Sequence, residues 1–307
     1  MRRGGIGASA ALPALLLAVV SVSFSAIFIR LADDGPATVV WIRMAFTVVL
    51  LAPWLVRDVR ARKVPQTRRD WLLVVASGVF LAAHFLTWTF SLRYTSVASS
   101  VLLVTVHPVL VAWLGRRLLG EAVSPRLAAG IALALGGTAI TSAGDWRVGA
   151  SALFGDLLAL AGAATFTGYL LIGRAVRTRT GTAGYSTPVY AVVAVCCLPV
   201  VGLTGSSVVP SPRTALACLG LAAVCTVLGH TVFNWTLRHL RTALVSVSLL
   251  GEPVITSLLA IPILGELPPG QAVAGGAVIL LGLGLALSER APAGTPAREV
   301  VELATPE

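Results

Sequence analysis

Long apolar runs alternate with short polar gaps along almost the whole chain. A transmembrane helix needs about 20 mostly apolar residues, and in lipid its backbone hydrogen bonds must be satisfied within the segment. With proline, glycine and charged clusters as boundaries, the pattern predicts an all-α membrane protein with ten transmembrane helices. The predicted spans are Leu12–Leu31, Ala37–Val56, Trp71–Leu92, Ser96–Gly115, Arg126–Ala143, Ala152–Gly173, Gly184–Thr204, Thr214–Leu237, Ala243–Leu264 and Gly270–Ser288.

Composition narrows the class of protein further. Hydrophobic residues make up 56% of the 307 residues and charged residues 12%, whereas a soluble domain carries about 25% charged residues. This hydrophobicity excludes intrinsic disorder. The four cysteines lie within apolar runs, without the spacing of a metal site or a disulfide framework. The sequence also lacks HExxH, GxSxG, P-loop and dinucleotide-binding motifs, so we expect neither an enzyme nor a bound cofactor or metal.

The placement of arginines predicts the orientation in the membrane. The net charge is +10, but the arginines fall in gaps between apolar runs, so we expect no nucleic-acid partner. With the N-terminus in the cytoplasm, eighteen Lys and Arg residues lie on the cytoplasmic side, four lie outside and one lies within a span. Because cytoplasmic loops are enriched in Lys and Arg, we expect a multi-pass cell-membrane protein with both termini in the cytoplasm. A cleaved signal peptide at the start is an alternative that the length of the first apolar run disfavours.

The chain contains an internal repeat. A shift of 145 residues superimposes several polar and turn residues, namely Leu92–Arg93 on Leu237–Arg238, Pro108 on Pro253 and Gly120–Glu121 on Gly265–Glu266. Each half holds an odd number of spans, so the second half should be inverted relative to the first. We therefore expect a cytoplasmic N-terminus over 1–11, one repeat over 12–145, an inverted repeat over 150–288 and a disordered cytoplasmic tail over 289–307. Inverted repeats place a substrate site near the membrane midplane.

Together these features resemble the drug/metabolite transporter superfamily, EamA type. The resemblance rests on the five-plus-five arrangement, the two Gly-Glu pairs, Gly251–Glu252–Pro253 and Gly155–Leu160, and it covers the chain from about Leu12 to Ser288. It implies small-molecule transport in a bacterial cell membrane, commonly export of amino acids, metabolites or drugs. His107 departs from the resemblance, which implies a carboxylate before the proline, and this argues against a mechanism with two symmetric carboxylates.

Ionisable side chains within spans are costly in lipid and are therefore candidate functional groups. They are Arg43, His84, His107, Asp156, His230 and Glu252. Because Pro108 and Pro253 each remove a helix hydrogen bond, they should free the carbonyls of Val104 and Leu249. Two interpretations stay open: His107 and Glu252 face a central cavity and bind substrate or protons, or the prolines are hinges and these side chains satisfy local partners.

The other candidate substrate-binding residues have equally open alternatives. Arg43 can bind a substrate carboxylate, or it can reach the outer interface and pair with Asp33 or Asp34. His84 with Trp88, and His230 with Asn234, share helix faces that suit an organic ligand, as does Tyr169; helix packing is the alternative. The members of this group are Arg43, His84, Trp88, His107, Tyr169, His230, Asn234 and Glu252.

Gating and packing residues complete the prediction. Glu121 and Glu266 end corresponding spans on opposite faces and, with Pro108 and Pro253, are candidate gating residues; solvated acids at helix ends are the alternative. We expect Asp156 to cap the sixth span. The glycines of the fifth and tenth spans, including Gly130, Gly137, Gly275 and Gly282, indicate close helix packing within a monomer, with a homodimer contact as the second possibility.

The sequence thus predicts a secondary transporter that exports small organic metabolites or drugs by alternating access. Proton coupling through His107, Glu252 and His230 is a further hypothesis. The expected partners are a small organic solute, protons and the lipid bilayer. The alternatives are a facilitative uptake permease or channel and, less favoured, an intramembrane enzyme.

Overall fold

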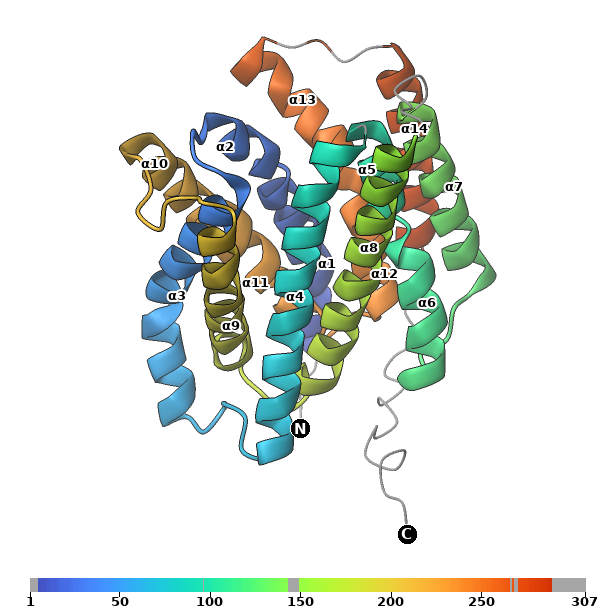
Figure 1. Cartoon of the computed structure of the whole chain (residues 1–307). Helices are drawn as coiled ribbons and strands as arrows, with labels where there is room; N and C mark the ends of the chain where they lie inside the picture. Colours follow the sequence, from blue (N-terminus) through green and yellow to red (C-terminus); the bar gives the residue numbers. More distant parts are fainter. Residues whose placement is uncertain (1–4, 96, 143–148, 266, 268–269, 289–307) are drawn as a thin grey trace.

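A computed structural model of the chain describes residues 5–95, 97–142, 149–265, 267 and 270–288. Every regular element in these residues is a helix (Figure 1). The elements are α1 (Gly5–Val22), α2 (Ser25–Leu31), α3 (Pro36–Arg60), α4 (Arg68–Tyr94), α5 (Val97–Val104), α6 (His107–Leu118), α7 (Pro125–Thr141), α8 (Ala150–Arg177), α9 (Thr182–Leu203), α10 (Pro212–Gly220), the π-helix η1 (Leu221–His230), α11 (Thr231–Thr236), α12 (Thr242–Ser248), the 3-10 turn η2 (Leu249–Gly251), α13 (Glu252–Leu264) and α14 (Gly270–Leu287).

These helices form the predicted membrane crossings. In the described part of the chain, nine helical segments are long and apolar enough to cross a membrane, and α7, with 17 residues, is a tenth at the short limit of a crossing. Four crossings consist of consecutive helices: α1 with α2, α5 with α6, α10 with η1 and α11, and α12 with η2 and α13. The prediction of an all-α protein with ten membrane-spanning helices is confirmed.

The fifth and tenth crossings, α7 and α14, pack closely through their glycines. A Cβ added to Gly130 would lie 2.7 Å from the carbonyl oxygen of Gly282, and one added to Gly137 would lie 2.6 Å from that of Gly275. The helices are therefore antiparallel. With the repeat shift of 145 residues, Gly130 corresponds to Gly275 and Gly137 corresponds to Gly282. The contact between Gly130 and Gly282 is therefore the symmetric counterpart of the contact between Gly137 and Gly275, as at a two-fold interface. This contact carries the inverted-repeat axis and is the intramolecular glycine packing that the sequence predicts.

The other crossings also pair across the two halves. α4 packs extensively on α8, α3 packs on α9, and α1 packs on η1. The third crossing, α4, packs on the sixth, α8. The repeat relates the third crossing to the eighth, which contains η1, and the sixth to the first, which contains α1, so the contact between α1 and η1 is the symmetric counterpart of the contact between α4 and α8. One cluster of buried apolar side chains continues through both halves, from Leu15 on α1 to Val245 on α12 and Ile279 on α14.

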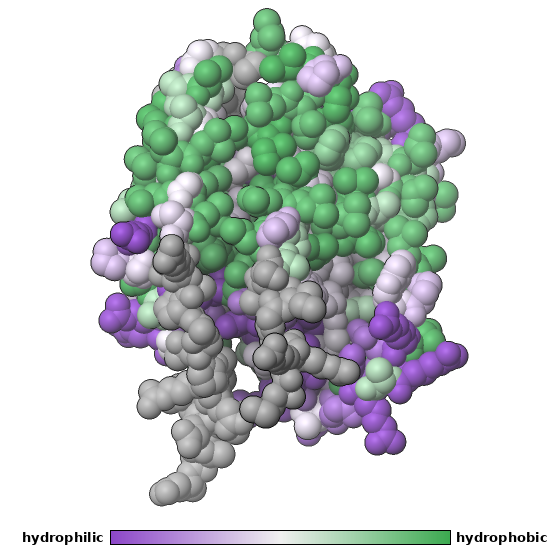
Figure 2. All heavy atoms as spheres, turned by 180° about the vertical axis from the view of Figure 1, so that it is seen from behind, coloured by the Kyte–Doolittle hydropathy of each residue, from purple (hydrophilic) through white to green (hydrophobic). Residues whose placement is uncertain are grey.

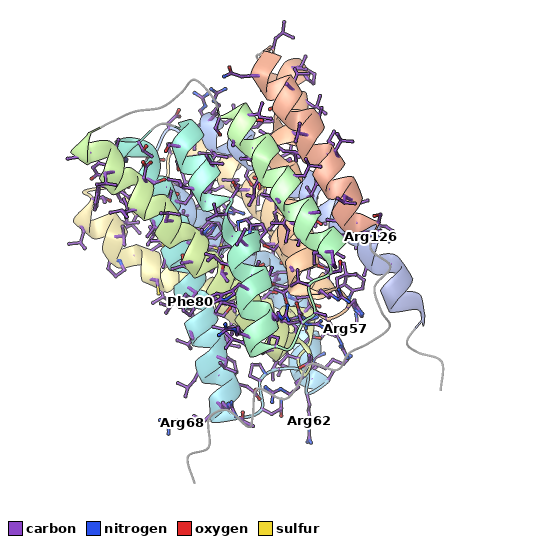
Figure 3. The ribbon with its side chains drawn as sticks, turned by 90° about the vertical axis from the view of Figure 1, so that its right-hand side faces the viewer. Arg57, Arg62, Arg68, Phe80 and Arg126 are labelled. Atoms are coloured by element: carbon purple, nitrogen blue, oxygen red, sulfur yellow. The ribbon has the colours of Figure 1, made fainter. Side chains whose placement is uncertain are left out.

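Most arginines gather at one end of the bundle. Arg57, Arg116 and Arg174 lie in the last turns of α3, α6 and α8. Figure 3 labels Arg57, Arg62 and Arg68 at this end, and Figure 1 shows that α1 begins and α14 ends there. Figure 2 shows hydrophilic residues at the same end, below a broad hydrophobic band. We call this end the arginine-rich face and the other end the opposite face.

Asp156 has a different role from the predicted helix cap. The helix α8 begins at Ala150, so Asp156 lies in its second turn. Its carboxylate accepts hydrogen bonds of 2.7 Å from the hydroxyls of Thr95 and Ser99. Asp156 therefore holds Thr95, after the end of α4, and Ser99 of α5 against α8. The capping prediction was wrong because the helix starts earlier than the apolar run suggests.

Candidate functional site

A cavity of about 480 Å³ lies between the two repeats. Its wall takes Arg43 from α3, His84 from α4, His107 from α6, His230 from η1 and Glu252 from α13. Each of these residues lies well inside a membrane crossing, and both halves contribute. This is the position at which inverted-repeat transporters bind their solutes.

The cavity extends toward the opposite face. Ile29 near the end of α2, Thr141 at the end of α7 and the following Ser142 are part of its wall. No described residue from the arginine-rich ends of α6 and α8 contributes to the wall. The cavity therefore connects the membrane interior with one end of the bundle.

The structure brings most of the predicted substrate-site residues together and separates others from them. The residues in the cavity wall are Arg43, His84, Trp88, His107, His230, Glu252 and Pro253. Tyr169, Asn234 and Pro108 do not line this cavity. Glu266 lies outside the described residues.

Arg43 is deeply buried beside the cavity. Its side chain is 5% exposed, its Nε donates a 2.8 Å hydrogen bond to Thr226 Oγ1, and its guanidinium lies 5.1 Å from the centre of the Phe85 ring. Its Nη2 has no hydrogen-bond partner in the described structure. The alternative pairing with Asp33 or Asp34 is wrong, because Asp33 pairs with Arg213 and Asp34 accepts the Ser211 amide.

Both prolines stand where their helices are interrupted, but of the two carbonyls predicted to be free only that of Val104 is left for a side chain. Opposite Pro108, the carbonyl of Val104 is free for the His107 side chain, whose Nδ1 lies 3.0 Å from it. In the second half, Pro253 follows the 3-10 turn η2, and the Leu249 carbonyl accepts the Glu252 backbone amide. Each break leaves the side chain before the proline, His107 or Glu252, at the cavity wall.

Aromatic rings connect the histidines. The Phe166 ring centre lies 4.6 Å from that of His84 and 4.9 Å from that of His107. Trp88 stacks on His84 at 6.3 Å, and Phe85 contacts His230 edge-on at 5.7 Å. One part of the wall is thus a continuous set of flat rings, which suits a flat organic solute.

Tyr169 and Asn234 form a separate polar cluster. Tyr169 donates a 2.8 Å hydrogen bond to Asn234 Oδ1, and Asn234 Nδ2 donates to Ser186 Oγ at 2.9 Å and to Tyr190 at 3.3 Å. Arg177 Nε donates to the Asn234 carbonyl at 2.9 Å. These groups satisfy one another and tie α8, α9 and α11 together.

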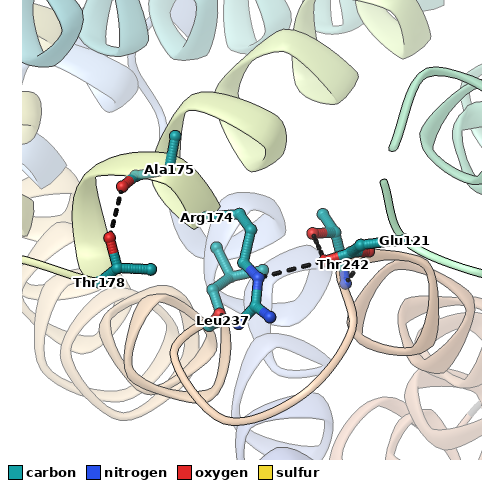
Figure 4. Close-up of polar contacts among 6 residues, drawn as sticks. All are labelled: Glu121, Arg174, Ala175, Thr178, Leu237 and Thr242. Carbon is teal, nitrogen blue, oxygen red and sulfur yellow. Dashed lines mark hydrogen bonds and ion pairs between the residues drawn. The ribbon is translucent and has the colours of Figure 1, made fainter. Parts of the chain in front are cut away.

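Glu121 joins the two repeats near the arginine-rich face (Figure 4). Its carboxylate accepts the backbone amide of Thr242 at 2.8 Å and the Thr242 hydroxyl at 3.0 Å, and it pairs with Arg174 at 3.1 Å. Arg174 also donates to the Leu237 carbonyl. We call Glu121, Arg174 and Thr242 the inner latch.

Sequence reasoning missed Phe85, Phe166 and Thr226. Phenylalanines in apolar helices carry no signal that separates a cavity wall from a core. Thr226 has a weak signal, since it lies four residues before His230, and the π-helix η1 holds both residues toward the site. Segments of π-helix occur frequently at functional sites. Among the described residues, no group of three His, Cys, Asp or Glu side chains is placed to hold a metal ion.

The comparisons with known proteins agree with this architecture. The model of the EamA-like transporter family matches residues 9–143 and 153–288. An uncharacterized transporter of Archaeoglobus fulgidus is 26% identical over 286 residues, covering 90% of this chain and 96% of the relative. The uncharacterized transporter YwfM of Bacillus subtilis is 24% identical over 244 residues, covering 77% and 78%.

The fold also matches a solved protein. A crystal structure superimposes with a TM-score of 0.76 at 20% sequence identity, covering 91% of this chain and 98% of the other. At this identity the match supports the fold alone. The family model covers nearly the whole chain in two consecutive copies, and the chain belongs to the EamA-like transporter family.

Proposed function

We propose that the protein is a secondary transporter that exports small organic metabolites or drugs across the cell membrane by alternating access. The observation that carries this proposal is a cavity that reaches one face of the bundle, while the inner latch joins the repeats at the other face. Alternating access requires such a state and its opposite. Inverted repeats supply the opposite state when the two halves exchange conformations.

The charge distribution supports the direction. We assign the arginine-rich face to the cytoplasm, because Lys and Arg are enriched in cytoplasmic loops. The start of α1 and the end of α14 then lie on the cytoplasmic side, and the cavity opens outward. In an exporter this is the state that releases the solute.

Titratable groups in the wall support proton coupling. His107, His230 and Glu252 line one cavity within the membrane. Ionisable groups at this depth commonly belong to solute or proton pathways, and imidazole changes its charge near neutral pH. In our proposal, protonation of these groups accompanies the change between the two states.

Flux measurements test each part separately. The full chain is reconstituted in liposomes and supplied with labelled amines, amino acids and aromatic acids. Saturable flux with counterflow exchange supports a carrier, whereas flux that rises linearly without counterflow would identify a channel. Flux that ignores an imposed pH gradient rejects proton coupling alone. Protein-free liposomes control for leak, and Asp33→Asn, at an exposed ion pair with Arg213, controls for the loss of a carboxylate.

Direction is tested in cells. Overproduction of the protein should lower the amount of a transported probe that the cells retain. Increased retention would instead support the alternative of an uptake permease.

A further inference from the structure

Four hydroxyl groups of the cavity wall each donate their proton to a backbone carbonyl. Thr105 donates to the carbonyls of Val101 and Leu102 at 2.8 and 2.9 Å, and Thr141 donates to Gly137 at 3.1 Å. Thr256 and Ser257 donate to the carbonyls of Ser23 and Pro253, both at 2.8 Å. A hydroxyl has one proton and two lone pairs. These four wall residues therefore offer a solute only hydrogen-bond acceptors.

Two imidazoles are also fixed as acceptors. His84 Nδ1 lies 3.0 Å from the Gly162 carbonyl, and His107 Nδ1 lies 3.0 Å from the Val104 carbonyl. A carbonyl can only accept, so Nδ1 carries the proton in each neutral ring. The Nε2 atoms then bear lone pairs. In the described structure, His107 Nε2 is buried and has no hydrogen-bond partner, so His84 is the imidazole that we assign to solute binding.

Glu252 adds a carboxyl group, which is an acceptor and carries a negative charge when it is ionised. It lies in the cavity wall at the start of α13, and its carboxyl group has no hydrogen bond or ion pair with a described residue. Glu252 lies 12 residues before Leu264, the last residue of α13. At about 1.5 Å per residue, Glu252 is about 18 Å from the outer end of its crossing. His84 lies about 15 Å from the outer end of α4 on the same count. Glu252 and His84 therefore place acceptors in the deeper part of the cavity.

Unpartnered donors lie nearer to the outer end. Arg43 Nη2 and Trp88 Nε1 have no hydrogen-bond partner in the described structure, and both residues line the cavity. Arg43 lies seven residues into α3 and Trp88 six residues before the end of α4, so both are about 10 Å from the opposite face. The cavity wall thus has hydrogen-bond donors on Arg43 and Trp88 nearer to its outer end and the acceptors of Glu252 and His84 deeper in the membrane.

Building on the transport function proposed above, we propose that this cavity selects solutes with a protonated amine on a flat, aromatic body. The ammonium group lies deep, where Glu252 and the lone pair of His84 accept its protons. The body stacks among Trp88 and Phe166, whose ring faces also attract a cation. An acceptor at the other end of the solute can meet Arg43, but a carboxylate is not required for binding.

Three probes of equal length test the proposal on the purified full chain. They are 3-phenylpropylamine, the neutral 3-phenylpropanol and the anionic 3-phenylpropionate, measured by calorimetric titration. We expect the amine to bind at least tenfold more tightly than the other two. Equal or tighter binding of 3-phenylpropionate overturns the proposal, and so does the absence of amine binding.

Variants locate the amine site. Glu252→Gln keeps the shape of the side chain and should weaken amine binding at least tenfold, whereas Asp33→Asn should leave it unchanged. Undiminished amine binding by Glu252→Gln overturns the proposed position. If 3-phenylpropionate saturates a carrier flux in liposomes and the amine does not, the selectivity fails while the transport function stands. Binding of the amine without flux of any probe contradicts the transport function instead.

Discussion

One methyl group at Gly137 should disrupt the contact that relates the two repeats. In Gly137→Ala, the new Cβ would lie 2.6 Å from the Gly275 carbonyl oxygen and 2.6 Å from the Ile279 amide nitrogen. Real Cβ atoms essentially never approach other atoms below 3.0 Å. Both neighbours are backbone atoms, so a side-chain rotation cannot relieve the contact, and α7 must move away from α14.

The size of the effect follows from two opposing terms. Overpacking in a close contact costs about 1–3 kcal/mol, and alanine gains about 0.5–1 kcal/mol over glycine in a helix. Because the clash involves two backbone atoms, we expect a net loss near the upper part of this range, about 2 kcal/mol. A loss of that size lowers Tm by about 3 °C in a chain of this length.

The neighbouring glycine provides a matched control. A Cβ on Gly136 would have no atom within 4 Å, so Gly136→Ala should keep or slightly raise Tm. Unfolding can be followed with a dye that fluoresces on reaction with newly exposed thiols, since Cys197, Cys218 and Cys225 are buried. Equal Tm values for the two variants would refute the assignment of the repeat axis to this helix pair.

Three further changes test other parts of the structure. In Glu121→Gln, the Thr242 amide loses a charged acceptor worth about 1.5–3 kcal/mol, so its hydrogen exchange should accelerate about tenfold or more; an unchanged rate contradicts the inner latch. The Ser211 amide and then the Thr214 hydroxyl hold the pKa of Asp34 below its usual value of 3.8. The stability that this lowered pKa provides is fully present above pH 3.8 and is lost as the pH falls through the lowered pKa. Protection of the Ser211 amide from hydrogen exchange should therefore fall in acid in the native chain, and it should stay low at every pH in Asp34→Asn. Asp156→Asn weakens the acceptor of two hydroxyl hydrogen bonds and should weaken the attachment of Thr95 and Ser99 to α8 by about 1–2 kcal/mol; an unchanged Tm would argue against this role.

The sequence predicts the architecture well because the membrane imposes it. Apolar runs long enough to cross lipid, and a repeat that matches proline and Gly-Glu positions, require ten inverted crossings. The proline rule also identifies the carbonyl of Val104, which His107 contacts at 3.0 Å. These predictions depend on local chemistry, which a single chain displays directly.

The faces of the helices could not be predicted in the same way. Asn234 lies four residues after His230, yet His230 lines the cavity and Asn234 bonds to Tyr169. The π-helix η1 wraps more residues per turn than an α-helix, so the spacing across its end no longer guarantees a common environment. Asp156 was misplaced because an apolar run does not mark the first residue of a helix.

The two repeats stay symmetric where they pack and differ where they face the cavity. At the axis, Gly137 and its counterpart Gly282 both lie against backbone atoms of the other helix, so a side chain at either position clashes. At the cavity, the residue before the proline is His107 in one half and Glu252 in the other. His107 and Glu252 therefore break the symmetry of the cavity wall, because an imidazole stands in one half where a carboxyl group stands in the other. The scaffold can stay nearly symmetric while the wall offers a solute two different chemical groups.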